Sequence, residues 1–257
     1  MPSTDLSDLK DRSERIRLGR KARAYLVHLF TASGVAFAFL AMAEVVQPGL
    51  DPRWVFGWLT LAVFIDAADG PLARAWDVKL YASRILGGTI DEIVDYLTFT
   101  FIPLVLVWRM DWLPGWDGLW VVLAMVASLL GFANTSAKQA QEGFFLGFPS
   151  YWNVVAYYVG LLAVEYGTDG AYVSLAAVLL LTVLTLVPVR FVYPNEAPSP
   201  WRAIVTGGGI AWLGLLLALL PTFPELPAWG DGWVLWVSFL YPAFYFGLSG
   251  WLDWTSQ

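Results

Sequence analysis

The stretch Ala24–Val46, AYLVHLFTASGVAFAFLAMAEVV, decides the fold class, because it continues for 23 residues without a Lys, Arg or Asp. A helix needs about 20 apolar residues to cross the hydrocarbon core of a bilayer. The whole chain has the same character, since 58% of its 257 residues are hydrophobic and 14% are charged. This composition argues against a water-soluble globule, and the 15 Trp, 16 Phe and 11 Tyr exclude a disordered chain.

Runs of comparable length recur between clusters of charge, Pro and Gly. They are continuously apolar, which favours helices over the alternating strands of a membrane β-barrel. We therefore predict an all-α, polytopic membrane helix bundle with about eight transmembrane helices. The predicted spans are 24–46, 54–73, 89–108, 118–135, 150–166, 171–191, 203–222 and 233–252. We expect residues 1–23 to form a cytoplasmic amphipathic segment at the membrane interface, and residues 24–257 to form one membrane-embedded domain.

The distribution of charge predicts the orientation. If the eight spans start inside, only Arg53 and Arg109 of the 15 basic residues lie on the outer side, so both termini should be cytoplasmic. The basic residues of Lys10–Arg23 are interrupted by Asp11 and Glu14, which argues against a nucleic acid as partner and favours an anionic membrane surface. The chain has no Cys, so thiol chemistry and disulfides are excluded.

Four carboxylates lie where a membrane protein rarely places them. Asp66 and Asp69 come at the inner end of the second span, and Asp91 and Asp95 come at the start of the third. Helical spacing puts each pair on one face of its helix. Four carboxylates cannot share a small site bare, because like charges raise each other's pKa values. Two divalent ions would balance the charge, and all-oxygen ligands suit Mg²⁺ or Mn²⁺.

Small residues and one arginine accompany these acids. Gly70, Ala73 and Gly87 leave room for a bulky nucleotide, and Arg74 is a candidate clamp for phosphate. The simpler interpretation is that single aspartates bond neighbouring helices and glycines permit close packing. A cation transporter is a further alternative, but it would place its acids near the bilayer midplane on broken helices.

From Asp66 to Asp95 the chain follows the pattern D-x2-D-G-x2-A-R-x12-G-x3-D-x3-D. This resembles the signature of the CDP-alcohol phosphotransferases, and all eight signature positions match. The spacer of 12 residues between Arg74 and Gly87 is similar to that of the bacterial phosphatidylcholine synthase branch. The stretches His28–Gly34 and Phe144–Pro149, the latter followed by Trp152 and Asn153, also resemble that branch.

The resemblance implies an enzyme of the bacterial inner membrane whose active site faces the cytoplasm. Its expected reaction transfers the phosphatidyl group of CDP-diacylglycerol to choline and yields phosphatidylcholine and CMP, usually with Mn²⁺. Asp95 would be the general base and complete the metal site formed by Asp66, Asp69 and Asp91. Members of the family are commonly homodimers. The resemblance assigns the CDP group to Asp69, Gly70, Ala73, Arg74 and Gly87.

The acceptor site is the least determined part of the prediction. Trimethylammonium ions are usually held by aromatic faces, and Tyr151 and Trp152 are candidates for choline binding, although both also suit an ordinary interfacial belt. The signature residues are expected to bind the CDP group and not the acceptor alcohol. Serine, inositol, glycerol phosphate and ethanolamine therefore remain alternative acceptors. We expect His28, which lies in the apolar first span, to be buried and hydrogen-bonded instead of catalytic.

Overall fold

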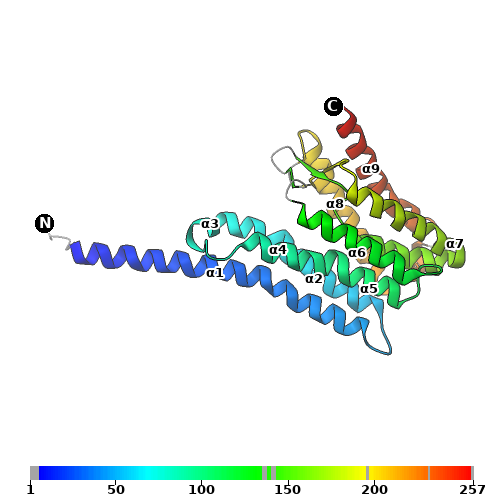
Figure 1. Cartoon of the computed structure of the whole chain (residues 1–257), viewed down its shortest axis with the longest axis horizontal. Helices are drawn as coiled ribbons and strands as arrows, with labels where there is room; N and C mark the ends of the chain where they lie inside the picture. The colour runs from blue at the N-terminus through cyan, green and yellow to red at the C-terminus, as the bar shows by residue number, and fades with distance from the viewer. Residues whose placement is uncertain (1–5, 135–137, 140–142, 195–196, 231, 256–257) are drawn as a thin grey trace.

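The structure is a computed structural model that describes residues 6–134, 138–139, 143–194, 197–230 and 232–255. It is a bundle of helices with a small sheet at one end (Figure 1). The α-helices are α1 (Leu6–Val45), α2 (Pro52–Ala75), α3 (Val78–Tyr81), α4 (Gly87–Asp95), α5 (Ile102–Arg109), α6 (Asp117–Ala133), α7 (Trp152–Leu186), α8 (Trp201–Leu219) and α9 (Val234–Thr255). The remaining elements are the π-helix η1 (Tyr96–Phe101), the 3₁₀ turns η4 (Leu220–Thr222) and η5 (Ala228–Gly230), and the strands β1 (Lys138–Gln139), β2 (Phe144–Leu146) and β3 (Arg190–Val192).

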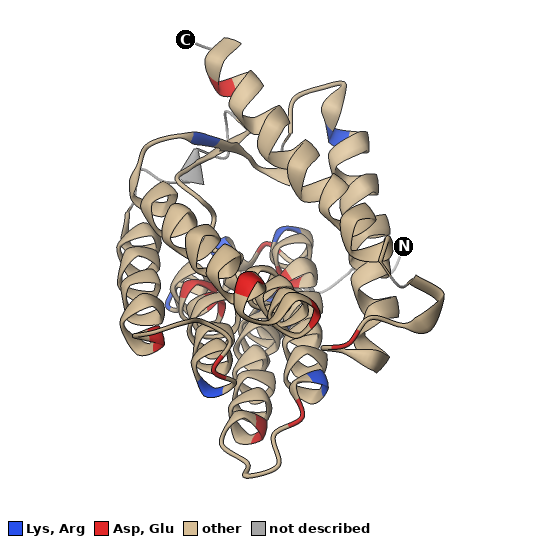
Figure 2. Ribbon diagram, turned by 90° about the vertical axis from the view of Figure 1, so that its right-hand side faces the viewer, with Lys and Arg blue, Asp and Glu red and all other residues tan. Residues whose placement is uncertain are grey.

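The helix surfaces are apolar enough to face lipid. Five of the described helices, within α1, α2, α7, α8 and α9, have the length and composition to cross a membrane. Large apolar side chains stand on their outer faces, among them Phe39, Ile210 and Leu240, which are 71%, 68% and 66% exposed. In Figure 2 most of the chain is tan, so most of its residues are neither acidic nor basic. Such a surface suits hydrocarbon and not water, which confirms the predicted all-α membrane bundle.

The predicted spans map onto the helices with two complications. Residues 89–108 form α4, η1 and α5 in unbroken succession. The second complication is α7, which has 35 residues and would be about 52 Å long if it were straight. However, the N–H of Phe148, just before α7, donates to the carbonyl of Leu184, near the end of α7. The chain therefore reverses within α7, at Gly167, whose backbone is non-helical (φ 54°, ψ −127°). The number of crossings, about eight, stays a prediction.

Helix α1 joins the two predicted domains without a break. Residues 13–23 are exposed, and Ala24, which follows them, is buried. The N-terminal part of α1 projects beyond the rest of the bundle (Figure 1). Near that boundary, Arg20 Nη1 donates to the Tyr81 hydroxyl at 2.8 Å, so α1 is attached to α3 there. The assignment of residues 1–23 to the membrane interface stays a prediction.

Helix α2 begins at a well-defined cap. The N–H of Arg53 donates to Asp51 Oδ1 at 3.0 Å, and Pro52 occupies the first turn, where no N–H is needed. The Arg53 guanidinium also hydrogen-bonds this carboxylate and holds the pKa of Asp51 below its usual value. These contacts determine where α2 starts, and Asp66 and Asp69 follow on the same helix.

A three-stranded antiparallel sheet, which was not predicted, joins two connections between helices. Its order is β1-β2-β3, with Phe145 paired to Phe191. Helix α9 holds the third strand, because the Tyr245 hydroxyl donates to the Val192 carbonyl at 2.9 Å and the Val192 N–H donates to Ser249 Oγ at 3.1 Å. The sheet therefore fixes the segments around β2 and β3 against the bundle.

Candidate functional site

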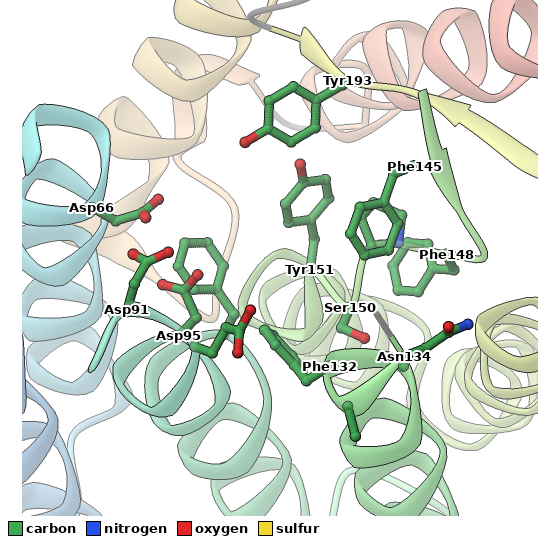
Figure 3. Close-up of a pocket in the computed structure, with 15 residues that line it drawn as sticks. Asp66, Asp91, Asp95, Phe132, Asn134, Phe145, Phe148, Ser150, Tyr151 and Tyr193 are labelled. Carbon is green, nitrogen blue, oxygen red and sulfur yellow. The ribbon is translucent and has the colours of Figure 1, made fainter. Parts of the chain in front are cut away.

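Three of the four predicted aspartates converge. Carboxylate oxygens of Asp66 on α2 and of Asp91 and Asp95 on α4 all lie within 4.8 Å of one another, and the three residues are half-buried. Figure 3 shows their carboxylates turned toward a common point. No His belongs to this group, so it offers only oxygen ligands. Such a set suits a hard divalent cation, which fits the predicted Mg²⁺ or Mn²⁺.

Two glycines set the distance between α1 and α4. A Cβ on Gly34 would lie 2.6 Å from Val94 Cγ1, and a Cβ on Gly87 would lie 2.9 Å from the His28 ring. Either contact is too short for a side chain, so α4 can approach α1 this closely only with glycine at these positions. Since α1 also packs along α2, this approach brings Asp91 and Asp95 next to Asp66.

His28 supports the turn that precedes α4. Its side chain is buried, and Nε2 lies 3.4 Å from the carbonyl oxygen of Ala82, in the spacer between the two acid pairs. The expectation of a buried, hydrogen-bonded histidine is therefore confirmed. The imidazole connects α1 to the spacer and borders Gly87.

Asp69 does not belong to the group that the other three acids form. It is 8% exposed, and its carboxylate interacts with the Thr31 side chain and the Gly70 N–H. Among the described residues the metal-compatible group contains Asp66, Asp91 and Asp95 without it. The spacing along α2 did not reveal its interaction with Thr31 on α1. The role of Asp69 as a metal ligand stays a prediction.

The other residues predicted for the CDP group surround the junction of α1, α2 and α4. The Arg74 guanidinium folds back over Gly70, with Nη1 3.5 Å from where a Cβ on that glycine would be. Ala73 packs on the small core of Ala24, Val27, Val78 and Ala82. The pocket that Asp66, Asp91 and Asp95 line is not lined by any of the five predicted residues, Asp69, Gly70, Ala73, Arg74 and Gly87.

That pocket has a volume of about 280 Å³ and is acidic on one wall and aromatic on the other. The acidic wall consists of Asp66, Asp91, Glu92 and Asp95. The opposite wall comes from η1, the end of α6, the sheet and the start of α7, and Figure 3 shows several of its rings around the cavity. Its aromatic residues are Phe99, Phe132, Phe145, Phe148, Tyr151 and Tyr193. No Lys or Arg lines this pocket in the part of the chain that is described.

The two residues predicted to bind choline are placed differently. Tyr151 lines the pocket. Trp152 does not, because it is fully buried and its Nε1 donates to Ser128 Oγ on α6 at 2.6 Å. Sequence reasoning missed Phe145 and Tyr193, which reach the pocket only because β2 and β3 pair. The FFLGFP stretch was a partial signal, since it contains Phe145.

No protein-family model matches this chain. Several bacterial proteins named phosphatidylcholine synthase are similar to it. The one from Pseudomonas aeruginosa is 36% identical over 234 residues, which cover 90% of this chain and 92% of the relative. Those from Mesorhizobium japonicum and Bradyrhizobium diazoefficiens are both 37% identical, over 177 and 190 residues. These alignments cover 68% and 73% of this chain, and 62% and 67% of the relatives.

Proposed function

The chain belongs to the phosphatidylcholine synthase family, and from this membership we propose that it transfers the phosphatidyl group of CDP-diacylglycerol to choline. The observation that carries the proposal is the convergence of Asp66, Asp91 and Asp95 at a pocket with an aromatic far wall. In the reaction, the choline oxygen forms a bond to the phosphorus of the phosphatidyl group, and the phosphoanhydride bond to CMP breaks. The hydroxyl proton goes to the protein.

Asp66, Asp91 and Asp95 are the residues that would hold Mn²⁺ or Mg²⁺, because their oxygens lie close together on two neighbouring helices. When bound, the ions would neutralise charge on the phosphates of the CDP group. The two-ion stoichiometry, and the participation of Asp69, are part of the proposal. An all-carboxylate group of this kind supports a hard cation over zinc, which prefers imidazole or thiolate.

Asp95 is the proposed general base. It lines the pocket on the same wall as Asp91, so it borders both the metal-compatible group and the acceptor cavity. An alcohol hydroxyl is weakly acidic, and a positioned base contributes roughly 10²–10⁴-fold to such a step. Asp95 would take the proton from choline as its oxygen attacks.

The CDP-lipid is proposed to bind on the other side of the carboxylates. Arg74, exposed at the end of α2, would contact phosphate oxygens, and Gly70 and Gly87 would leave space for the nucleotide. The diacylglycerol tails would remain in the bilayer. This arrangement puts donor and acceptor on opposite sides of Asp66, Asp91 and Asp95.

Choline fits the pocket better than the other acceptors considered. A serine carboxylate or a glycerol phosphate needs a cationic partner, and in the described part of the chain no Lys or Arg lines the cavity. The aromatic residues on the opposite wall suit a cationic acceptor. The cytoplasmic orientation of this site in a bacterial inner membrane and a homodimeric assembly belong to the proposal.

The test is conversion of labelled choline into lipid by the purified full-length protein with CDP-diacylglycerol and Mn²⁺. We expect phosphatidylcholine and CMP to form in equal amounts, and both to disappear with a chelator or without the CDP-lipid. Serine, inositol, glycerol phosphate and ethanolamine serve as competing acceptors. Equal incorporation of choline without CDP-diacylglycerol, or a clear preference for another alcohol, would overturn the proposal.

A further inference from the structure

We propose that Tyr151 and Tyr193, with Phe145 and Phe148 behind them, form a rigid aromatic wall that binds the trimethylammonium group and selects choline over less methylated amino alcohols. We call these four residues the aromatic cap. The inference rests on the proposed function and extends it, because it assigns acceptor selection to residues outside the eight-position signature. All four line the pocket that contains Asp66, Asp91 and Asp95.

The pairing of β2 with β3 brings two members of the aromatic cap together. Phe145 lies opposite Phe191 in the antiparallel register, so both side chains are on one face of the sheet. Tyr193 follows Phe191 by two residues and shares that face. Its N–H donates to the Gly143 carbonyl at 2.9 Å, which extends the strand pairing to Tyr193. Figure 3 shows Tyr193 and Phe145 at the same side of the cavity.

The side chains of the two residues next to Tyr151 are both hydrogen-bonded to Ser128. Ser150 Oγ lies 3.1 Å from Ser128 Oγ, and Trp152 Nε1 donates to the same oxygen at 2.6 Å. Ser150 also has a positive φ of 55°, which turns the chain sharply before Tyr151. The Tyr151 ring then lies edge-on to Phe148, with centroids 6.4 Å apart and an interplanar angle of 84°. Tyr151 is therefore held in place before any ligand binds.

Tyr193 is fixed in a comparable way through its neighbour. Both backbone groups of Val192 are bonded to side chains of α9, namely Tyr245 and Ser249. A side chain that is already ordered loses little entropy on binding, so a rigid wall contributes more affinity than a mobile one. The sheet, α6 and α9 thus act together to position the aromatic cap.

The chemistry of the two walls matches the two ends of choline. A trimethylammonium group has no N–H to donate, and the faces of aromatic rings attract such a cation. A primary ammonium group is more strongly hydrated and needs acceptors that ring faces do not provide. With the methyl groups on the aromatic cap, the hydroxyl of the same molecule points to the acidic wall, where Asp95 lies.

The experiment compares acceptor kinetics of the full-length protein at saturating CDP-diacylglycerol and Mn²⁺. We expect Tyr193→Leu and Tyr151→Leu each to raise the KM for choline about tenfold or more, which is the size of a desolvated cation–π contact. The KM for CDP-diacylglycerol should stay unchanged, and the preference for choline over N,N-dimethylethanolamine should fall. Tyr193→Phe and Tyr151→Phe keep the ring and should retain that preference.

Tyr166→Leu is the matched control, because Tyr166 is exposed and lies against Trp236, away from the pocket. Tetramethylammonium chloride gives a test that requires no variant. It should inhibit the unaltered protein competitively against choline, and ammonium chloride at the same concentration should not. Equal inhibition by both salts would overturn the inference. So would leucine variants that are active and keep the choline KM and the preference.

The two proposals fail in different ways. If the unaltered protein does not incorporate choline at all, the proposed function is wrong. If it does incorporate choline, but the leucine variants match it in KM and preference, only the aromatic cap is wrong.

Discussion

Asp95 is the residue whose substitution separates proton removal from binding of the CDP-lipid. Asp95→Asn keeps the shape of the side chain and one carbonyl oxygen but removes the base. We expect turnover to fall at least about 100-fold, while CDP-diacylglycerol binding remains largely intact. Turnover measures the loss of the base, and equilibrium binding of the CDP-lipid measures whether the donor still binds. Glu165→Gln is the control, because Glu165 is an exposed carboxylate far along α7. Near-normal turnover of Asp95→Asn would remove Asp95 from the mechanism.

Arg74 should affect the donor substrate and not the acceptor. Its guanidinium is exposed beside Gly70, one turn beyond the acids of α2. Because hydrogen bonds to charged groups contribute about 1.5–3 kcal/mol, Arg74→Ala should raise the KM for CDP-diacylglycerol about tenfold or more. The KM for choline should change little. Arg109→Ala provides an exposed arginine at the other end of the bundle for comparison. An unchanged KM for the CDP-lipid would contradict the assignment of Arg74.

The spacing of the acids predicted which carboxylates share a helix face, and the structure confirms this for Asp91 and Asp95. Spacing could not predict where each carboxylate is directed, because that depends on neighbours from other helices. Asp69 interacts with Thr31 on α1, and a sequence pattern along α2 contains no information about that contact. Tyr151 was predicted to lie near the acceptor, whereas the burial of Trp152 depends on Ser128 in α6.

At the scale of elements, the contact between α1 and α4 should be sensitive to one methyl group. In Gly34→Ala the new Cβ would lie 2.6 Å from Val94 Cγ1, so the helices must separate. Overpacking of this kind costs about 1–3 kcal/mol, and it would move Asp91 and Asp95 away from Asp66. We expect a lower unfolding temperature in detergent and reduced turnover.

Gly57→Ala is the matched substitution on α2, since no atom lies within 4 Å of its Cβ position. It should leave turnover unchanged and stabilise the helix by up to about 1 kcal/mol. If both alanine variants behave alike, the close approach at Gly34 does not position the acids.

The cap of α2 gives a prediction that depends on pH. Asp51→Ala removes the acceptor for the Arg53 N–H and should lower stability by about 1 kcal/mol. Asp51→Asn keeps an acceptor and removes only the charge. Because the folded-state pKa of Asp51 is lowered, its charge stabilises the folded state above the unfolded pKa of about 3.9. That contribution is lost as pH falls through the folded pKa.

Unfolding temperatures of the unaltered protein and Asp51→Asn should therefore differ slightly at neutral pH and converge in acid. The difference should be small, since an exposed ion pair contributes little. A difference in unfolding temperature that grows on acidification would contradict this explanation.

The long helices were predictable because continuous apolar runs are a strong signal, and the short strands were not. Strands of two or three residues, such as β1 and β2, are too short to show a periodic pattern. Phe145 and Tyr193 become neighbours only through the pairing of β2 and β3, across the whole of α7. The reversal at Gly167 had been expected as a boundary between two spans, and the backbone conformation there explains why one apolar stretch forms two helical segments.

At the scale of the whole molecule, the lack of Cys allows a direct test of orientation. Ser13 lies on the exposed N-terminal part of α1, and Gln47 is exposed just beyond its other end. If α1 crosses the membrane with the N-terminus inside, a membrane-impermeant maleimide should label Gln47→Cys in intact spheroplasts. It should label Ser13→Cys only after the membrane is opened. Turnover of each variant verifies its fold, and the unaltered protein gives the background. Labelling of both sites from one side would exclude a crossing by α1. If Ser13→Cys were labelled in intact spheroplasts and Gln47→Cys only after the membrane is opened, the carboxylates and the aromatic cap would lie on the opposite face of the membrane from the CMP pool.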